Sequence, residues 1–232
     1  MAKEVVEKTE PLAVLTAKVI SYVKENLNQI ASIASVILII AAGIFYWQYT
    51  SLKAEKASFS GFSRALITMS QDVKTEAERE VLSQQALEMF KSVVEKYPKT
   101  KTGAASLYYS GNCSLTLNNY DEAIDYYNKF LGKSDKSFVY LRALAYEGLG
   151  YAYEGKAEFA KAIEWFEKQK NEGKGVDISV ALLNIARCQE LSGDNAAACK
   201  SYTDFENEYE SSSFIETVQM KTNDLCAEDV KG

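Results

Sequence analysis

The sequence contains no histidine among its 232 residues. This absence excludes serine–histidine and cysteine–histidine nucleophile pairs, together with every metal site that needs an imidazole ligand. The four cysteines form no C-x-x-C motif, so the pattern offers no redox or metal site either. Carboxylate pairs such as Asp121–Glu122 fall in turns or on surfaces that we expect to be solvated. We therefore expect no enzyme, no catalytic residue, no metal and no cofactor.

Proline is almost absent, since only Pro11 and Pro98 occur. Because proline ends helices, so few of them favour helix throughout the chain. No stretch forms a basic patch and the formal net charge is −6, which argues against nucleic acid as a partner. With 47% hydrophobic residues, a chain of this length has room for a sizeable core.

One segment near the N terminus lacks charge altogether. Residues 30–47 read IASIASVILIIAAGIFYW, and the apolar segment extends over residues 29–49. About 20 such residues form a helix long enough to cross a ~30 Å hydrocarbon core. Tyr46, Trp47 and Tyr49 stand at its C-terminal end, where interfacial aromatic residues are common. The alternative is a buried core helix. A cleaved signal peptide fits poorly, because the run ends in bulky aromatic residues where a cleavage site needs small ones.

The predicted span divides the chain into three parts. These are an arm, residues 1–28, a transmembrane helix, residues 29–49, and a C-terminal domain, residues 52–232. Lysines flank both ends of the span, so the positive-inside rule does not decide its orientation. A single N-terminal anchor usually sends a large C-terminal domain out of the cytoplasm, and we expect that topology here.

The arm has its own hydrophobic pattern. A helically spaced series of apolar residues predicts an amphipathic helix that runs into the span: Leu12, Leu15, Val19, Val23, Leu27 and Ile30. Such a helix could lie on the membrane surface or pack on a partner. It could equally continue without a break into the span.

Small and aromatic residues recur along the C-terminal domain. Four alanines lie 37, 39 and 36 residues apart along the chain: Ala86, Ala123, Ala162 and Ala198. Each of them is followed, four residues later, by an aromatic residue. Twelve residues before each of the last three stands another small residue: Gly111, Gly150 and Ala186. Turn-forming sequences lie between the two small positions. A period in this range indicates stacked helix hairpins, whose small residues let two helix backbones approach to ~8 Å.

These units resemble the tetratricopeptide repeat. Residues 104–137, 143–176 and 179–212 match its small and aromatic positions, and Pro98 stands where the terminal proline of an earlier, degenerate unit belongs. The leading helix of that first unit is expected within residues 52–71. The resemblance implies an all-α solenoid of three to four hairpins. Phe214, Val218 and Leu225 continue a helical stripe and predict a capping helix.

The leading helices of such a solenoid line its inner face, where a peptide or partner helix can bind. On this register Tyr108, Asn112, Tyr151 and Arg187 point away from the packing positions, and we predict that they contact a protein partner. Tyrosine and arginine are frequent in interface hot spots. The alternative is a solvated helix face. The clamp for acidic C termini needs Lys and Asn at fixed positions, and Tyr108, Glu147 and Leu183 occupy the first of these places, so we do not expect it.

Two cysteines are candidates for a disulfide. Cys188 and Cys199 stand at the tenth and twenty-first repeat positions, which lie at about the same height in one hairpin. Outside the cytoplasm they could bridge. The alternative is that they pack as small apolar residues, as Ala152 does at the tenth position of the preceding unit.

The whole arrangement of arm, anchor and repeats resembles a bacterial family of membrane-anchored tetratricopeptide-repeat proteins, that of the ancillary subunit of the Sec translocon. The segments that carry the resemblance are FYWQYTSLKAEKAS after the anchor and YPKTKTGAASLYYSGN before the repeats. It implies an inner-membrane protein with a cytoplasmic N terminus and a periplasmic, chaperone-like repeat domain. Its partners would be translocon subunits, envelope chaperones or client polypeptides, without nucleic acid or a small-molecule substrate. The alternative is a scaffold for another envelope machine, in division, secretion or outer-membrane assembly.

Overall fold

The computed structural model describes residues 10–172 and 177–226, and these ranges are α-helical apart from short turns and one 3₁₀ turn. The described residues belong to two units, Met1–Lys53 and Ala54–Gly232. The predicted all-α fold is therefore confirmed. Residues 173–176, at the end of the second predicted repeat unit, lie outside the described residues. So do residues 1–9 of the arm and residues 227–232 of the C-terminal domain.

The first unit holds α1, Glu10–Glu25, and the N-terminal part of α2, Leu27–Met69. An 18-residue window of α2 has a mean hydropathy of 2.3, and none of that window is buried. By length and composition, α2 is the one helix in the described part of the chain that could cross a membrane. A core helix would be mostly buried, so that alternative does not fit this exposed segment.

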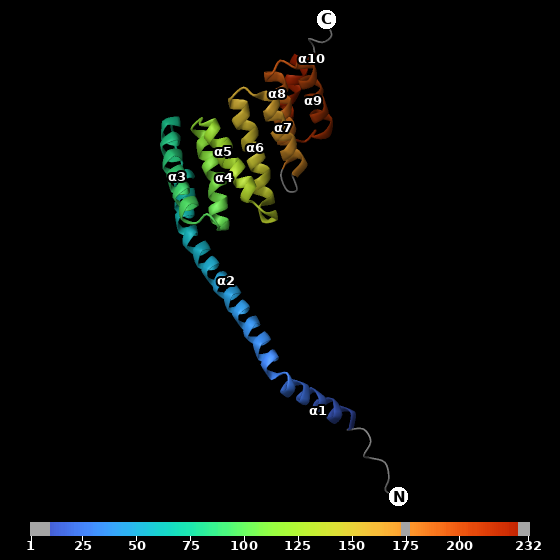
Figure 1. Ribbon diagram of the computed structural model, residues 1–232. Helices are drawn as coiled ribbons and strands as arrows, with labels where there is room; N and C mark the ends of the chain where they lie inside the picture. The colour runs from blue at the N-terminus through green and yellow to red at the C-terminus, as the bar shows by residue number, and fades with distance from the viewer. Residues whose placement is uncertain (1–9, 173–176, 227–232) are drawn as a thin grey trace. The chain divides into compact units, whose positions relative to one another are not determined.

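The second unit is a row of helix hairpins that stack side by side (Figure 1). The C-terminal turns of α2 pair with α3, and three further hairpins and a last helix follow. Their bounds are α3 Glu76–Lys96, α4 Lys101–Thr116, α5 Tyr120–Lys133, α6 Val139–Gly155, α7 Phe159–Glu172, α8 Ile178–Leu191, α9 Asn195–Glu208 and α10 Ile215–Cys226, with the 3₁₀ turn η1 at Lys136–Phe138. The predicted solenoid of three to four hairpins with a capping helix is therefore confirmed.

Polar side chains set the helix starts, and a repeated turn closes three of the hairpins. The Thr75 side chain and Glu78 form a capping box at α3, and Thr100 caps α4. The turns before α5, α7 and α9 each place one residue in the left-handed region, with φ of 58°, 56° and 84° at Asn118, Ala157 and Gly193. All three stand five residues before a repeat alanine, so one turn geometry serves each hairpin.

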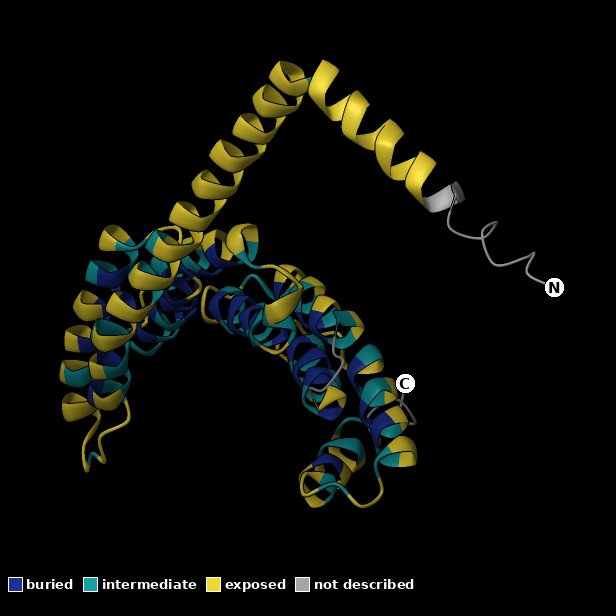
Figure 2. Cartoon of the chain, turned by 90° about the horizontal axis from the view of Figure 1, so that it is seen from below, coloured by how far each residue is buried: buried dark blue, intermediate teal, exposed yellow. Residues whose placement is uncertain are grey.

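The repeat alanines lie at the helix crossings, as the register predicts. Ala86, Ala123, Ala162 and Ala198 are all 0% exposed. The paired glycines are equally constrained: a Cβ at Gly150 would lie 2.4 Å from Cε1 of Phe166, and one at Gly111 would lie 2.6 Å from Cε1 of Tyr127. Figure 2 shows the buried positions gathered where neighbouring helices face one another. Only a residue without a side chain fits at these two places.

The first, degenerate unit uses the last turns of α2 as its leading helix. Ala65 is 0% exposed and packs with Ala86 and Phe90 of α3. The Glu55 carboxylate accepts hydrogen bonds from the backbone N–H groups of Lys101 and Thr102, each at 2.8 Å. The first N–H groups of α4 have no partner within the helix, so the carboxylate satisfies two of them. Its negative charge also interacts favourably with the positive end of the helix dipole. The leading helix expected within residues 52–71 is thereby found.

Candidate protein interface

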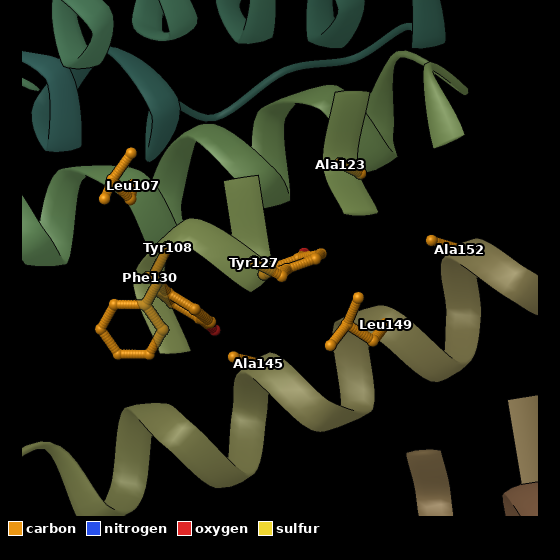
Figure 3. Close-up of a cluster of buried hydrophobic side chains, with 8 residues drawn as sticks. All are labelled: Leu107, Tyr108, Ala123, Tyr127, Phe130, Ala145, Leu149 and Ala152. Atoms are coloured by element: carbon orange, nitrogen blue, oxygen red, sulfur yellow. The ribbon is translucent and has the colours of Figure 1, made fainter. Parts of the chain in front are cut away.

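Tyr108, the first of the four predicted partner-binding residues, belongs to the core. Its side chain is 7% exposed and packs against the rings of Tyr127 and Phe130, with centroids 6.0 and 5.8 Å away. Figure 3 shows these three rings in one cluster with Leu149. Burial raises the pKa of Tyr108 to about 12. The expectation that this tyrosine points away from the packing positions is therefore wrong, because its position on the leading helix turns it toward the second helix of its own hairpin.

Asn112 stands one turn further along α4 and is half-buried. Its Oδ1 accepts a hydrogen bond of 2.7 Å from the hydroxyl of Tyr127, a ring that is 0% exposed. Burial raises the pKa of Tyr127 well above its ordinary value, so the hydroxyl stays protonated and keeps donating. Asn112 thus satisfies a core tyrosine, and its further contact with a partner stays a prediction.

Tyr151 of α6 joins a polar chain that crosses from one repeat to the next. Its hydroxyl donates to Glu147 at 3.0 Å and accepts from Nδ2 of Asn184 on α8 at 3.1 Å. Burial raises the pKa of Glu147, although hydrogen bonds from Tyr151 and from Gln169 oppose this rise. Tyr151 therefore connects two hairpins while part of its ring stays accessible.

Arg187 of α8 forms a two-point ion pair on the inner face. Its Nε and Nη2 donate to the two carboxylate oxygens of Glu154 on α6, at 3.0 and 2.6 Å. The guanidinium carbon also lies 5.6 Å from the centroid of the Tyr151 ring. A two-point pair of this kind fixes the guanidinium in place, and the Arg187 side chain is still 40% exposed.

A cavity of about 330 Å³ opens beside Tyr151 and Arg187. Helices α6, α8 and α9, the loop before α10 and α10 itself contribute its walls. The apolar wall is Val180, Leu183, Phe214 and Val218, and the polar groups include Asn184, Glu190, Tyr202 and Lys221. Tyr108 and Asn112 do not line it. The structure therefore brings two of the four predicted residues together and adds an apolar wall that the repeat register did not single out.

The charges around this cavity are paired. Lys221 lies 2.5 Å from Oε1 of Glu190, and Arg187 is held by Glu154. Both cations are therefore paired with carboxylates of the chain itself. The site offers an apolar wall with a rim of paired charges and hydrogen-bonding groups, which suits a polypeptide segment with a large apolar side chain.

A larger cavity, of about 640 Å³, lies on α2 and α3. Its walls include Gly61, Arg64, Glu88 and Met89. Tyr97 is its only aromatic residue, and no α4–α10 residue contributes to it. We prefer the smaller cavity as the candidate interface, because anchored Tyr and Arg side chains are the groups that dominate protein interfaces.

The structure corrects the predicted pairing of Cys188 with Cys199. Cys199 forms a disulfide with Cys226 of α10, across a Cα–Cα distance of 5.4 Å. Cys188 is 0% exposed and its thiol lies 3.9 Å from Oε2 of Glu154. It therefore faces the preceding repeat and packs as a small residue, whereas Cys199 faces the capping helix. Cys113 is the second free, buried cysteine.

Matches to known proteins agree with this geometry. Models of the tetratricopeptide repeat match residues 83–138, 137–169 and 180–212. The chain is a tetratricopeptide-repeat protein. Among the described residues, no group of three or more cysteine or acidic side chains could hold a metal ion. No curated protein matches this tetratricopeptide-repeat chain.

Two solved structures share the fold of this tetratricopeptide-repeat protein. One is the Podosopora anserina putative kinesin light chain with nearly identical TPR-like repeats, and the other is a single-substitution variant of the same protein. Each is 14% identical, with a TM-score of 0.58, and the match covers 74% of this chain and 86% of the other. At this identity the likeness extends to the fold alone.

Proposed function

We propose that this protein is a membrane-anchored scaffold that holds a segment of another protein in the cavity between α6, α8 and α10. The observation that carries the proposal is the combination of an apolar wall with fixed Tyr151 and Arg187 side chains on the inner face of a repeat solenoid. Tetratricopeptide repeats act through protein partners, and the wholly exposed apolar window of α2 supports an anchor.

The disulfide supports an extracytoplasmic repeat domain. Disulfides persist in oxidising compartments and are rare in the cytoplasm, where thiols are kept reduced. The Cys199–Cys226 bond lies in the second unit, on the C-terminal side of the span. Together with the anchor this favours a cytoplasmic N terminus and an extracytoplasmic repeat domain. The resemblance to the ancillary translocon family makes these the two sides of a bacterial inner membrane, with the repeat domain in the periplasm.

Blocking thiols in denatured, unreduced protein from cells tests this topology. An alkylating reagent of known mass should label only Cys113 and Cys188, and reduction beforehand should raise the number of labelled cysteines from two to four. Four labelled cysteines without reduction would place the domain in a reducing compartment.

The resemblance to the ancillary translocon family supports a finer proposal. Within it, the repeat domain serves at the Sec translocon as a chaperone-like factor for emerging polypeptides. The alternative is a scaffold for another envelope machine, and an anchored solenoid suits both. Identification of the captured partner separates the two.

A photo-reactive amino acid placed at Leu183 should capture the partner in cells, because this side chain lines the cavity. The matched control is Glu164, which is exposed on α7 and does not line the cavity. We expect at least tenfold more cross-linked product at Leu183, with translocon subunits or exported polypeptides in the product. Equal yields at the two positions would show that the cavity is not the binding site. Division or outer-membrane assembly proteins in the cross-linked product would favour a scaffold for another envelope machine.

A further inference from the structure

Helix α1 exposes one continuous apolar face. The fractional exposures of Leu15, Val19, Tyr22 and Val23 are 64%, 55%, 65% and 38%. Because residues three and four apart share a face of a helix, these four side chains lie along one stripe. An isolated helix that leaves such a stripe in water is unfavourable, so something covers it.

The opposite side of α1 is mixed, with polar side chains beside the exposed apolar residues Val14 and Ile20. Ser21 and Lys24 are exposed and lie opposite the stripe, whereas the exposed Lys18 and Glu25 border it. The long lysine side chains can reach toward lipid headgroups or water while their stems stay near apolar surface. A helix with one continuous apolar stripe and lysines outside that stripe fits a lipid interface, where one side of the helix contacts acyl chains and the other contacts headgroups and water.

The position of α1 in the chain brings it to a bilayer. Only Asn26 separates it from α2, and the uncharged run begins at Ile30. At 1.5 Å per residue, the end of α1 lies about 8 Å from the start of that run. The C-terminal end of the stripe therefore stands near headgroup depth in every molecule whose span is inserted, and the rest of the stripe stays there when α1 runs along the membrane surface.

The chain also changes direction at this point. Asn26 is a turn residue between the two helices, and its Nδ2 donates to the carbonyl oxygen of Tyr22 at 2.8 Å. Figure 2 shows α1 leaving the N-terminal end of α2 at an angle. A continuous helix from the arm into the span, one of the three sequence-based readings, is therefore not what the chain forms.

We propose that α1 lies in the plane of the membrane interface, with Leu15, Val19 and Val23 toward the acyl chains of the bilayer that α2 crosses. The inference rests on the proposed span. We prefer a lipid surface to a second copy of the chain as the cover for the stripe. The span keeps α1 next to lipid at all times, whereas a second copy must first diffuse to it.

Single cysteines on the two faces of α1 test this placement. In the wild-type chain Cys113 and Cys188 are buried and Cys199 is bonded to Cys226, so no native thiol is accessible without reductant. The full chain is reconstituted in vesicles of phosphatidylethanolamine and phosphatidylglycerol. Val19→Cys and Ser21→Cys, two residues apart on opposite faces, are then treated with a charged, water-soluble maleimide. Ile37→Cys in the uncharged run reports whether the span is inserted.

We expect the Val19→Cys thiol to react at least tenfold more slowly than the Ser21→Cys thiol, with Ile37→Cys unreactive. Protection of Val19→Cys should persist when the protein is diluted into excess lipid. Equal rates at both faces with Ile37→Cys protected would overturn the surface helix while the span stands. Protection that disappears on dilution would assign the stripe to a second copy instead. A reactive Ile37→Cys would instead remove the span on which the inference rests.

Discussion

Replacing Phe166 by alanine should lower the free energy of unfolding by ~3–5 kcal/mol. The ring is 0% exposed, lies against the backbone of Gly150 and meets the Tyr151 ring edge-on at a centroid distance of 5.4 Å. Its removal leaves a cavity at the crossing of α6 and α7, and the next hairpin stacks on this crossing. Urea unfolding of the full chain in mild detergent, followed by far-ultraviolet circular dichroism, measures the loss.

A substitution at Gly150, which packs against Phe166, tests the same helix crossing from the other side. Gly150→Ala should cost ~1–3 kcal/mol, because its Cβ would lie 2.4 Å from a Phe166 ring atom that has no room to move. Gly132→Ala in α5 is the control: nothing lies within 4 Å of its Cβ, so this change should be neutral or stabilise the helix by up to ~1 kcal/mol. The Gly150→Ala, Phe166→Ala double variant should lose less than the two single losses together, because the new methyl group occupies the vacated space. Equal effects of Gly150→Ala and Gly132→Ala would show that the repeat register is misplaced.

The repeat register could be read from the sequence because close packing restricts residue type. Two helices that cross at Gly150 and Ala162 leave no room for a larger side chain, so the small residues recur at fixed spacing. The ends of the helices follow different rules. Thr100 and Asp177 cap α4 and α8 through their side chains, and such caps are no part of the repeat pattern. The predicted unit 104–137 therefore begins three residues after the start of α4, and the unit 179–212 begins one residue after the start of α8.

The candidate interface was less predictable, because it depends on how repeats stack. Tyr151 contacts Asn184, and Glu154 contacts Arg187, each across 33 residues of sequence. Such pairs form only when one leading helix lies at the correct height beside the next, and the small pattern residues do not determine that offset. Tyr108 shows the same limit, since its ring packs inside its own hairpin although its register position is that of cavity-lining Leu183.

The apolar stripe predicted the capping helix, but it did not predict which residue the cysteine of that helix would pair with. Cys226 stands beyond the last repeat, where no repeated spacing gives the height of a residue relative to Cys199. Val218 shows what the stripe could predict: it is 1% exposed and packs in the cluster that contains Ala198 and Phe205. An apolar stripe determines which face of α10 is buried, whereas the partner of a single cysteine depends on how far the helix is shifted along its axis.

Removing the Cys199–Cys226 disulfide should lower the free energy of unfolding of the capped end by ~3–4 kcal/mol. The bond closes a loop with a sequence separation of 27, and losing it gives the unfolded chain more conformations. Only one apolar side chain of α10, Val218, is fully buried, so noncovalent packing holds this helix weakly without the bond. The double variant Cys199→Ser, Cys226→Ser should therefore show faster amide hydrogen exchange in α10, while α4 and α5 keep their protection.

The same experiment connects the disulfide to the candidate interface, because Thr217, Val218 and Lys221 of α10 line the cavity. Cross-linking at Leu183 should fall in the double variant, whose cavity has lost an ordered wall. Reductant provides the internal control: it should lower the unfolding midpoint of the wild-type chain and leave that of the double variant unchanged. If reductant leaves the wild-type midpoint unchanged as well, the bond does not hold the cap. The stability of α10 would then rest on Val218 and on the ion pair of Lys221 with Glu190.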